Sequence, residues 1–231
     1  MARKERTNNS LTVRLDDMIE VQPVTHNQEL VFEAWDNGDN LVLSGSAGTG
    51  KTFLALALAF EEVLKADTDY DQVVVIRSMV PTREIGFLPG TLEEKQDAYT
   101  SPYRAICSEL FGDHTTYNKA ITAKTIRFES TSFIRGVTID NSVIVVDEMQ
   151  NLNFHELDSV ITRVGKNTRI IFCGDYRQSD FKWADDKDGI IKFLSIVEQL
   201  KKFTSITFGW EDIVRSDFVR DYIMTKEMLG H

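Results

Sequence analysis

Cysteine and proline are scarce in this sequence, and long apolar runs are missing. Its 231 residues include 2 cysteines and 4 prolines. Cys107 and Cys173 lack the spacing of metal ligands, so we expect two reduced core thiols rather than a disulfide or a metal site. No apolar stretch approaches the roughly 20 residues that span a bilayer. These absences argue against a disulfide scaffold and against a membrane protein.

The amino terminus also lacks the apolar stretch of a secretory signal, because residues 1–10 are polar and basic. We therefore expect a cytoplasmic protein. Residues 1–20 are expected to form an amino-terminal arm that is mobile or lies at an edge. Residues 21–231 are expected to form a single domain, since a chain with 42% hydrophobic content supplies one sizeable core.

Positive charge is in short supply as well. The formal net charge is -10, with 26 basic and 36 acidic residues. An acidic chain repels phosphate backbones at long range. A nucleic-acid site on this protein therefore has to be a local basic patch, and the sequence contains no long basic run.

What the sequence does contain is an alternation of short apolar runs and helical patterns. Several runs are rich in Val and Ile and apolar on both faces, which is typical of parallel strands covered by helices on both sides. This alternation predicts a doubly wound α/β fold with a mainly parallel sheet. Expected strands are residues 40–44, 72–77, 125–128, 142–146, 169–173 and 205–208. Expected helices are residues 51–65, 92–111, 154–164, 188–203 and 217–229.

The strongest motif lies between the first expected strand and the first expected helix, and it fits the phosphate-loop pattern G-x-x-x-x-G-K-[ST]. Glycines let backbone N–H groups point at phosphates beside a helix amino terminus. Lys51 is expected to reach the β- and γ-phosphates of ATP, and the Thr52 hydroxyl to hold Mg²⁺. The alternative, an ordinary glycine-rich turn, does not fit the strand–loop–helix context. The motif residues are Gly45, Ser46, Ala47, Gly48, Thr49, Gly50, Lys51 and Thr52.

A second motif is the acidic pair Asp147 and Glu148, which follows four β-branched residues. The carboxyl end of a buried strand faces the ligand crevice of an α/β sheet. Asp147 is therefore expected to organise Mg²⁺ through water, and Glu148 to orient or deprotonate the attacking water. The alternative is a strand end capped by solvated acids.

Two further polar groups are candidates for the same site. Gln178, after another buried strand, is expected to sense the γ-phosphate, and Asp175 to hold that loop; the alternative is an ordinary Gly-Asp turn. Upstream, Asn27 and Gln28 precede a helical segment. An amide offers both a donor and an acceptor and can read the adenine edge, or Asn27 can instead cap the helix.

The order of these motifs resembles the PhoH family, whose core is similar to the first motor domain of superfamily 1 helicases. The resemblance runs from about residue 23 to residue 223. Departures from the family pattern fall where substrate or a neighbouring subunit is expected, at Ser78, Thr82-Arg83, Val137 and Ser216. The specific marks are residues 86–90 followed by Lys95, Arg135-Gly136, residues 147–151, Thr162-Arg163, Gly174-Asp175 with Gln178, and residues 212–215.

The resemblance implies a RecA-like P-loop NTPase fold, a three-layer sandwich that binds and hydrolyses ATP. It also implies an association with RNA or single-stranded DNA and assembly into a homo-oligomeric ring, for example a hexamer. Superfamily 1 motors close two cores around ATP, and this chain has room for one. We therefore expect Arg215 to act as an arginine finger in a neighbouring subunit, with Arg163 and Arg135 as substitutes. The alternative is a surface arginine paired with Asp212 or Asp217.

Candidate nucleic-acid contacts lie in and after the loop of the second strand, where Tyr99 and Tyr103 could stack on bases. The alternative is a solvated helix face with two aromatics at the core edge. A different class of function also stays open, namely a regulatory ATP-binding module that changes assembly with nucleotide state and turns over slowly. The basic side chains expected to contact nucleic acid are Arg77, Arg83, Lys95 and Arg104.

Overall fold

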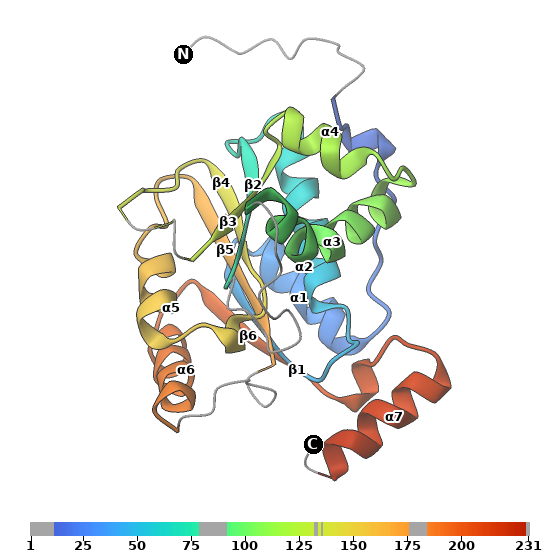
Figure 1. Cartoon of the computed structure of the whole chain (residues 1–231), viewed down its shortest axis with the longest axis vertical. Coiled ribbons are helices and arrows are strands. Elements are labelled where there is room, and N and C mark those ends of the chain that lie inside the picture. Colours follow the sequence, from blue (N-terminus) through green and yellow to red (C-terminus); the bar gives the residue numbers. More distant parts are fainter. Residues whose placement is uncertain (1–11, 79–91, 132–133, 135, 176–183, 230–231) are drawn as a thin grey trace.

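The computed structural model describes residues 12–78, 92–131, 134, 136–175 and 184–229, and Figure 1 shows how they are arranged. The strands in this part of the chain form one six-stranded parallel sheet in the order β3-β2-β4-β5-β1-β6. Since β5 lies between β1 and β4, the carboxyl ends of these three strands are neighbours. The strands are β1 (Asn40–Gly45), β2 (Gln72–Arg77), β3 (Ile126–Ser130), β4 (Ser142–Val146), β5 (Thr168–Gly174) and β6 (Phe203–Phe208).

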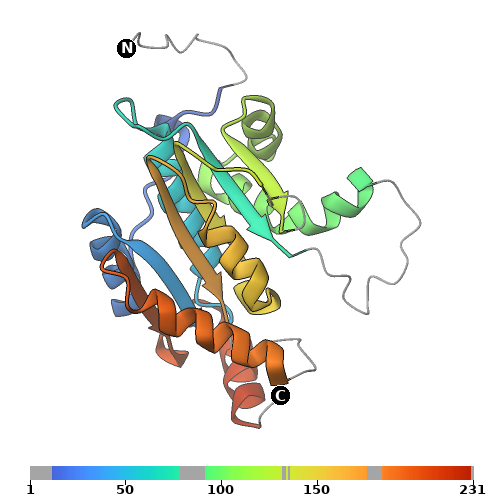
Figure 2. The ribbon, with the colours of Figure 1, turned by 90° about the vertical axis from the view of Figure 1, so that its left-hand side faces the viewer.

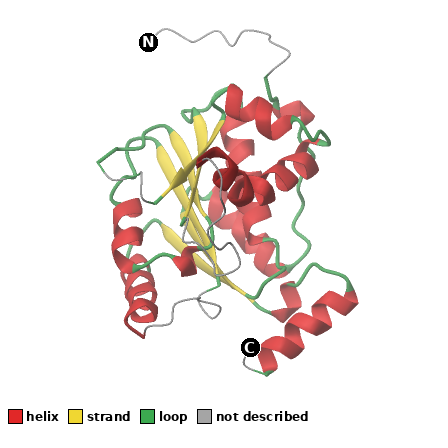
Figure 3. Cartoon of the chain, viewed as in Figure 1, coloured by secondary structure: helices red, strands yellow, loops and turns green. Residues whose placement is uncertain are grey.

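Helices cover both faces of the sheet, as Figures 2 and 3 show. The helices α1, α2 and α3 lie on one face, while α5 and α6 lie on the other. Among the described helices, none is long and apolar enough to cross a membrane. The helices are α1 (His26–Asp36), α2 (Lys51–Leu64), α3 (Leu92–Phe111), α4 (Thr116–Thr122), α5 (Phe154–Ile161), α6 (Ala184–Val197) and α7 (Asp217–Met228).

Two apolar cores, one on each face, explain the continuous apolar runs of the strands. Side chains alternate along a strand, so Val73 and Val75 of β2 join the core under α2, whereas Val74 and Ile76 join the core under α5 and α6. Residues 54–60 of α2 are all buried, as expected for a helix that is apolar nearly all round. The predicted three-layer α/β fold with a parallel sheet is confirmed.

Two helix starts differ from expectation. α6 begins at Ala184 rather than 188. It ends at Val197 rather than 203, because the chain turns there and Phe203 opens β6. The N-cap of α1 is Thr25, whose hydroxyl accepts a hydrogen bond from the Gln28 N–H. The alternative role of Asn27 as the cap is therefore wrong.

The segment that leads into α1 packs on the face that carries α2 and α3. Val13 is buried in that core, and the Ile19 N–H donates to the Leu110 carbonyl at 2.8 Å. Residues 1–11 of the predicted arm lie outside the described residues. Part of that arm, residues 12–20, therefore contacts the domain.

Candidate nucleotide-binding site

The phosphate loop joins β1 to α2 at the carboxyl edge of the sheet. Gly45 has a φ of 113°, and a Cβ at this position would lie 2.1 Å from the Phe208 carbonyl oxygen. Only glycine fits here, because the loop passes against the end of β6. Gly50, at the N-cap of α2, makes no side-chain cap to the first helical turn. The amino terminus of α2 is therefore available to an anion.

Lys51 lies folded over this loop. Its Nζ donates to the Gly45 carbonyl at 2.8 Å, the Ser46 carbonyl at 2.6 Å and the Thr49 hydroxyl at 3.2 Å. Burial lowers the pKa of Lys51, while neighbouring acidic groups oppose this effect. A phosphate would replace neutral carbonyl acceptors with charged oxygens, and such charge-assisted hydrogen bonds are about twice as strong.

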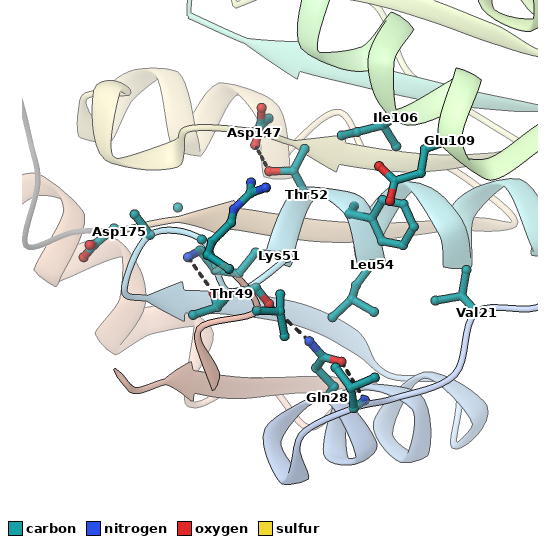
Figure 4. Close-up of a pocket in the computed structure, with 18 of the residues that line it drawn as sticks. Val21, Gln28, Thr49, Lys51, Thr52, Leu54, Ile106, Glu109, Asp147 and Asp175 are labelled. Atoms are coloured by element: carbon teal, nitrogen blue, oxygen red, sulfur yellow. Dashed lines mark hydrogen bonds between the residues drawn. The ribbon is translucent and has the colours of Figure 1, made fainter. Parts of the chain in front are cut away.

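Thr52 and Asp147 connect the two expected motifs directly. The Thr52 hydroxyl donates to Asp147 Oδ1 at 2.7 Å, and Figure 4 shows the two side chains facing each other. The second carboxylate oxygen accepts from the Tyr103 hydroxyl at 2.8 Å. Tyr103 of α3 is 0% exposed, and burial raises the pKa of its hydroxyl, so it stays a neutral donor. Tyr103 thus fixes the orientation of the Asp147 carboxylate.

These oxygens fit a magnesium ion that is bound together with phosphates. Mg²⁺ takes oxygen ligands and keeps several waters, so it needs only one or two protein ligands beside the substrate. Thr52 and Asp147 supply two adjacent hard oxygen atoms. Within the described ranges, no group of three or more His, Cys, Asp or Glu side chains could hold a metal by itself.

Glu148 is held by a residue that sequence reasoning passed over. Gln150 donates from Nε2 to Glu148 Oε2, and its Oε1 accepts the Asp175 N–H at 3.0 Å. A Cβ at Gly174 would lie 2.3 Å from Gln150 Oε1 and 3.0 Å from the Met149 backbone nitrogen, so glycine leaves room for this amide at the end of β5. Burial raises the pKa of Glu148, and the nearby Asp147 carboxylate adds to this effect. Gln150 therefore links the ends of β4 and β5. The sequence hinted at this role only because Gln150 lies within residues 147–151, one of the segments that carry the family resemblance.

Helices α1 and α3 border the other half of the cavity. Gln28 of α1 is buried, donating to the Thr49 carbonyl at 3.3 Å and accepting from the Val24 N–H at 2.9 Å. Ile106 and Glu109 reach the cavity from α3, opposite Gln28 (Figure 4). Asn27 instead donates to Asp212 at 2.7 Å. Gln28 lines the cavity and Asn27 does not.

The segment after β6 returns to the phosphate loop of its own chain. The Val214 N–H donates to the Gly48 carbonyl at 3.0 Å, and a Cβ at Gly48 would lie 3.0 Å from Arg215 Cγ. Arg215 lines the same cavity. Arg215 thus lies beside the phosphate loop of its own chain, and its expected role as an arginine finger in a neighbouring subunit stays a prediction.

Glu227 of α7 also contacts the loop, and the sequence offered no motif for it. Its Oε2 accepts from the Ser46 hydroxyl at 3.0 Å and from Trp210 Nε1 at 2.6 Å. These contacts hold α7 against the outside of the phosphate loop.

The resulting cavity has a volume of about 620 Å³, within the range of small-molecule sites. Gly45 and Ser46 shape the loop without lining the cavity, and Gln178 lies outside the described residues. The expected residues that line it are Gln28, Ala47, Gly48, Thr49, Gly50, Lys51, Thr52, Asp147, Glu148, Asp175 and Arg215.

Several other expectations fall elsewhere. Tyr103 is buried and cannot stack on a base, so that prediction is wrong. Arg77 ends β2 directly after Ile76, whose carbonyl accepts the Asp147 N–H at 2.9 Å, so it lies at the strand end beside the site. Burial opposes the charge of Arg77, but Tyr103 and Asp147 outweigh it and raise the Arg77 pKa. Arg163 lies before the amino end of β5, at the opposite edge of the sheet. Arg83, Arg135 and the side chain of Lys95 lie outside the described residues.

A phosphate loop, an acidic pair and a polar strand end at one edge of a parallel sheet define a P-loop nucleoside triphosphatase fold. A solved structure with this fold is the large terminase of a thermophilic bacteriophage in complex with ADP. It aligns with a TM-score of 0.51 and 16% identity, covering 89% of this chain and 50% of the terminase.

The chain belongs to the PhoH family, because residues 20–226 match the family described as PhoH-like protein. A PhoH-like protein of Mycobacterium leprae is 30% identical over 205 residues, which cover 88% of this chain and 57% of the relative. Protein PhoH of Escherichia coli K12 is 28% identical over 218 residues, covering 94% and 58% respectively. The chain thus spans less than two thirds of the length of these relatives.

Proposed function

We propose that this protein is a magnesium-dependent ATPase of the PhoH type. The observation that carries the proposal is the 2.7 Å hydrogen bond between Thr52 and Asp147, beside Lys51 on the phosphate loop. A glycine-rich turn or a solvated acidic strand end would not need this link. It joins two motifs that are 95 residues apart in the chain.

Each residue then has a distinct task in phosphoryl transfer. Lys51 binds the β- and γ-phosphate oxygens in place of the loop carbonyls. Thr52 and Asp147 hold Mg²⁺, Asp147 through water, and the ion neutralises charge on the phosphates when it is bound. Glu148 accepts a proton from the attacking water, since its raised pKa makes it a stronger base than an ordinary Glu.

The loop after β5 is proposed to sense the γ-phosphate. Asp175 begins this loop and is anchored by Gln150, which also contacts Glu148. Gln178 is the residue proposed to contact the phosphate. Asp175 is connected to Glu148 through the one amide side chain of Gln150.

Gln28 supports ATP as the nucleotide. A glutamine amide has two N–H donors and two acceptor lone pairs, and the Thr49 and Val24 contacts use one of each. One donor and one acceptor remain to pair with the adenine edge. Val21, Leu54 and Ile106 supply the apolar surface on which a base can pack.

The proposed setting is a cytoplasmic homo-oligomer, such as a hexameric ring, that acts on RNA or single-stranded DNA. Exposed apolar side chains on α7 support oligomerisation, since Phe218 is 81% exposed and Tyr222 is 63% exposed. Large apolar side chains gathered on one surface helix are typical of protein–protein contacts.

A second candidate function is a regulatory module that changes assembly with nucleotide state and hydrolyses ATP slowly. The net charge of -10 favours it, because nucleic acid is repelled at long range. Steady-state ATPase assays with and without single-stranded RNA, beside Lys51→Ala, distinguish the two. Several-fold stimulation by RNA supports the nucleic-acid ATPase, whereas slow turnover that ignores RNA while ATP changes the oligomer mass supports the regulatory module.

A further inference from the structure

A second cavity of about 620 Å³ lies on the face that carries α2 and α3, near the edge of the sheet. It is formed by α3, α4 and the edge strand β3, which lie together in Figures 1 and 2. None of the motifs used so far contributes to it. Ten described residues line it: Gln72, Thr100, Arg104, Tyr117, Asn118, Ile121, Lys124, Ile126, Arg127 and Phe128.

The lining is cationic in a chain that is strongly acidic overall. Arg104, Lys124 and Arg127 line the cavity, and none of the ten lining residues is acidic. The Arg104 guanidinium lies over the Tyr117 ring, 5.3 Å from its centroid, which fixes the positive group in place. Three cationic side chains at one hollow make the local potential positive, which favours an anion there.

Arg127 has a donor left over. Its Nη1 pairs with Glu129 at 3.2 Å, while its Nε is buried and has no hydrogen-bond partner among the described atoms. Nε itself is closed to a ligand, but the Arg127 side chain as a whole is 37% exposed. Its accessible part lines the hollow and can meet an anion there.

The remaining lining residues indicate the chemistry of the rest of the ligand. Ile121 is 39% exposed and Phe128 is partly exposed, so both offer apolar surface. Gln72 and Asn118 add amides, which offer donors and acceptors to a heterocycle edge. An anionic group attached to a flat, hydrogen-bonding body is the chemistry of a nucleotide unit.

We propose that this cavity binds a nucleotide unit of a single-stranded nucleic acid, with the phosphate at Arg104, Lys124 and Arg127. The inference rests on the proposed action on RNA or single-stranded DNA and gives it a location. The proposed site takes the place of the expected base stacking on Tyr103, and it keeps Arg104 as a contact to nucleic acid. Since the phosphate is met by side-chain cations without a metal, binding here needs no Mg²⁺.

The test is fluorescence anisotropy of the full chain with labelled single-stranded RNA and DNA over a range of salt concentrations. The variants are Arg104→Gln, Lys124→Gln, Arg127→Gln and the triple variant. Lys119→Gln is the matched control, since Lys119 lies on α4 outside the cavity and pairs with Asp113. Thermal unfolding and ATP binding check that each variant is folded. Lys124 is exposed, which makes its single variant safe for the fold.

We expect each single variant to weaken oligonucleotide binding several-fold and the triple variant at least about tenfold. The slope of log affinity against log salt should fall by about 0.7 in the triple variant, because the three cations meet one phosphate and each phosphate contact on a single strand contributes about 0.7. Lys119→Gln should bind as the parent does. Inorganic phosphate and a nucleoside monophosphate should compete only weakly.

Two results would overturn the location, and they distinguish failure of this inference alone from failure of the proposed function. If the parent binds oligonucleotide and the triple variant binds equally well, the nucleic acid lies elsewhere and only this inference fails. If the cavity takes inorganic phosphate or a mononucleotide while oligonucleotide does not bind even at low salt, the inference fails together with the proposed nucleic-acid role.

Discussion

The two cavities have the same volume of about 620 Å³ but differ in how they are built. The first is made by loops at the carboxyl ends of β1, β4 and β5, where a parallel sheet collects polar groups. The second is made by the sides of α3 and α4 against an edge strand. A loop site leaves a motif in the sequence, because consecutive residues serve it. A site between helix faces draws single residues from distant positions.

Their charges differ in a way that follows from the ligand. Carboxylates outnumber cations in the first cavity, whereas the second is lined by cations and no acids. A phosphate cannot lie beside carboxylates unless a metal ion bridges them, so the first cavity is suited to a magnesium–phosphate complex. The second is suited to a bare phosphate. The charged residues of the first are Lys51, Glu109, Asp147, Glu148, Asp175 and Arg215.

Helix α3 contributes to both cavities. Tyr103 points to Asp147 beside the first cavity, and the next residue, Arg104, lines the second. Adjacent residues of a helix point in directions about 100° apart, so one helix can serve two sites. The comparison therefore predicts two chemically separate sites that share one wall, which is helix α3.

Lys51→Ala should have the largest effect and should separate the two sites. We expect ATP affinity and turnover to fall about 100-fold or more, because the main cation at the phosphates is lost. Oligonucleotide affinity without nucleotide should stay unchanged. Lys65→Ala, at the other end of α2, is the control for a lost lysine. Equal loss of both ligands in Lys51→Ala would show that the cavities are not independent.

Glu148→Gln should reduce turnover about 10²- to 10⁴-fold while ATP still binds, since the proton acceptor is lost and Thr52 and Asp147 remain. Pre-steady-state hydrolysis and nucleotide titration measure the two quantities separately. Glu61→Gln, an exposed position on α2, should behave as the parent does. Unchanged turnover in Glu148→Gln would remove Glu148 as the base.

Arg215→Ala should slow hydrolysis about tenfold or more, since a charge-assisted contact to phosphate is lost. The position beside Gly48 predicts action in cis. Mixing Arg215→Ala with Glu148→Gln should therefore restore no activity beyond the sum of the two preparations. Restored turnover in the mixture would show that the arginine serves a neighbouring subunit instead.

Tyr103→Phe tests the shared wall and should have a smaller effect. Loss of one hydrogen bond to Asp147 should lower basal turnover about threefold to tenfold and raise the magnesium concentration needed for half-maximal activity. Oligonucleotide affinity should not change, but stimulation of turnover by oligonucleotide should shrink. If stimulation stays at the parental ratio, α3 does not transmit binding from the second cavity.

The fold and the phosphate side of the first cavity can be predicted from the sequence because each depends on local pattern. The strands at residues 72–77 and 142–146 have the ends that the sequence predicts, since β-branched runs have sharp polar borders. Lys51, Thr52 and Asp147 are recognisable because consecutive residues at a strand end act together.

What escapes prediction depends on contacts between distant segments. Tyr103 resembles an exposed aromatic on a helix in the sequence, but its partner Asp147 is 44 residues away. Gln150 and Glu227 each act through two hydrogen bonds, and the partners Asp175 and Ser46 lie on loops far away in the sequence, so no spacing rule reveals these roles. The second cavity is the extreme case, because its three cations come from α3, β3 and the turn after α4.

The last prediction concerns stability rather than turnover, at Cys107, which lies one turn after Tyr103 on the shared wall. Burial raises the pKa of Cys107 from 9.0 to about 12, so its thiol should not react with a thiol reagent at pH 8 until the protein unfolds. Between about pH 9 and pH 12 the unfolded chain releases this proton while the folded chain keeps it. The free energy of unfolding should therefore fall with rising pH, by at most about 1.4 kcal/mol per pH unit for this thiol.

Cys107→Ala should remove the contribution of this thiol to the pH dependence of the free energy of unfolding. The slope that remains in the variant comes from the other groups, and its difference from the slope of the parent gives the contribution of Cys107. Cys173 is buried as well, so the single variants assign each thiol. Rapid modification of Cys107 in the folded protein would mean that α3 opens readily. The two cavities would then be separated by a moving helix, and binding in one would change the shape of the other without needing the Tyr103–Asp147 contact.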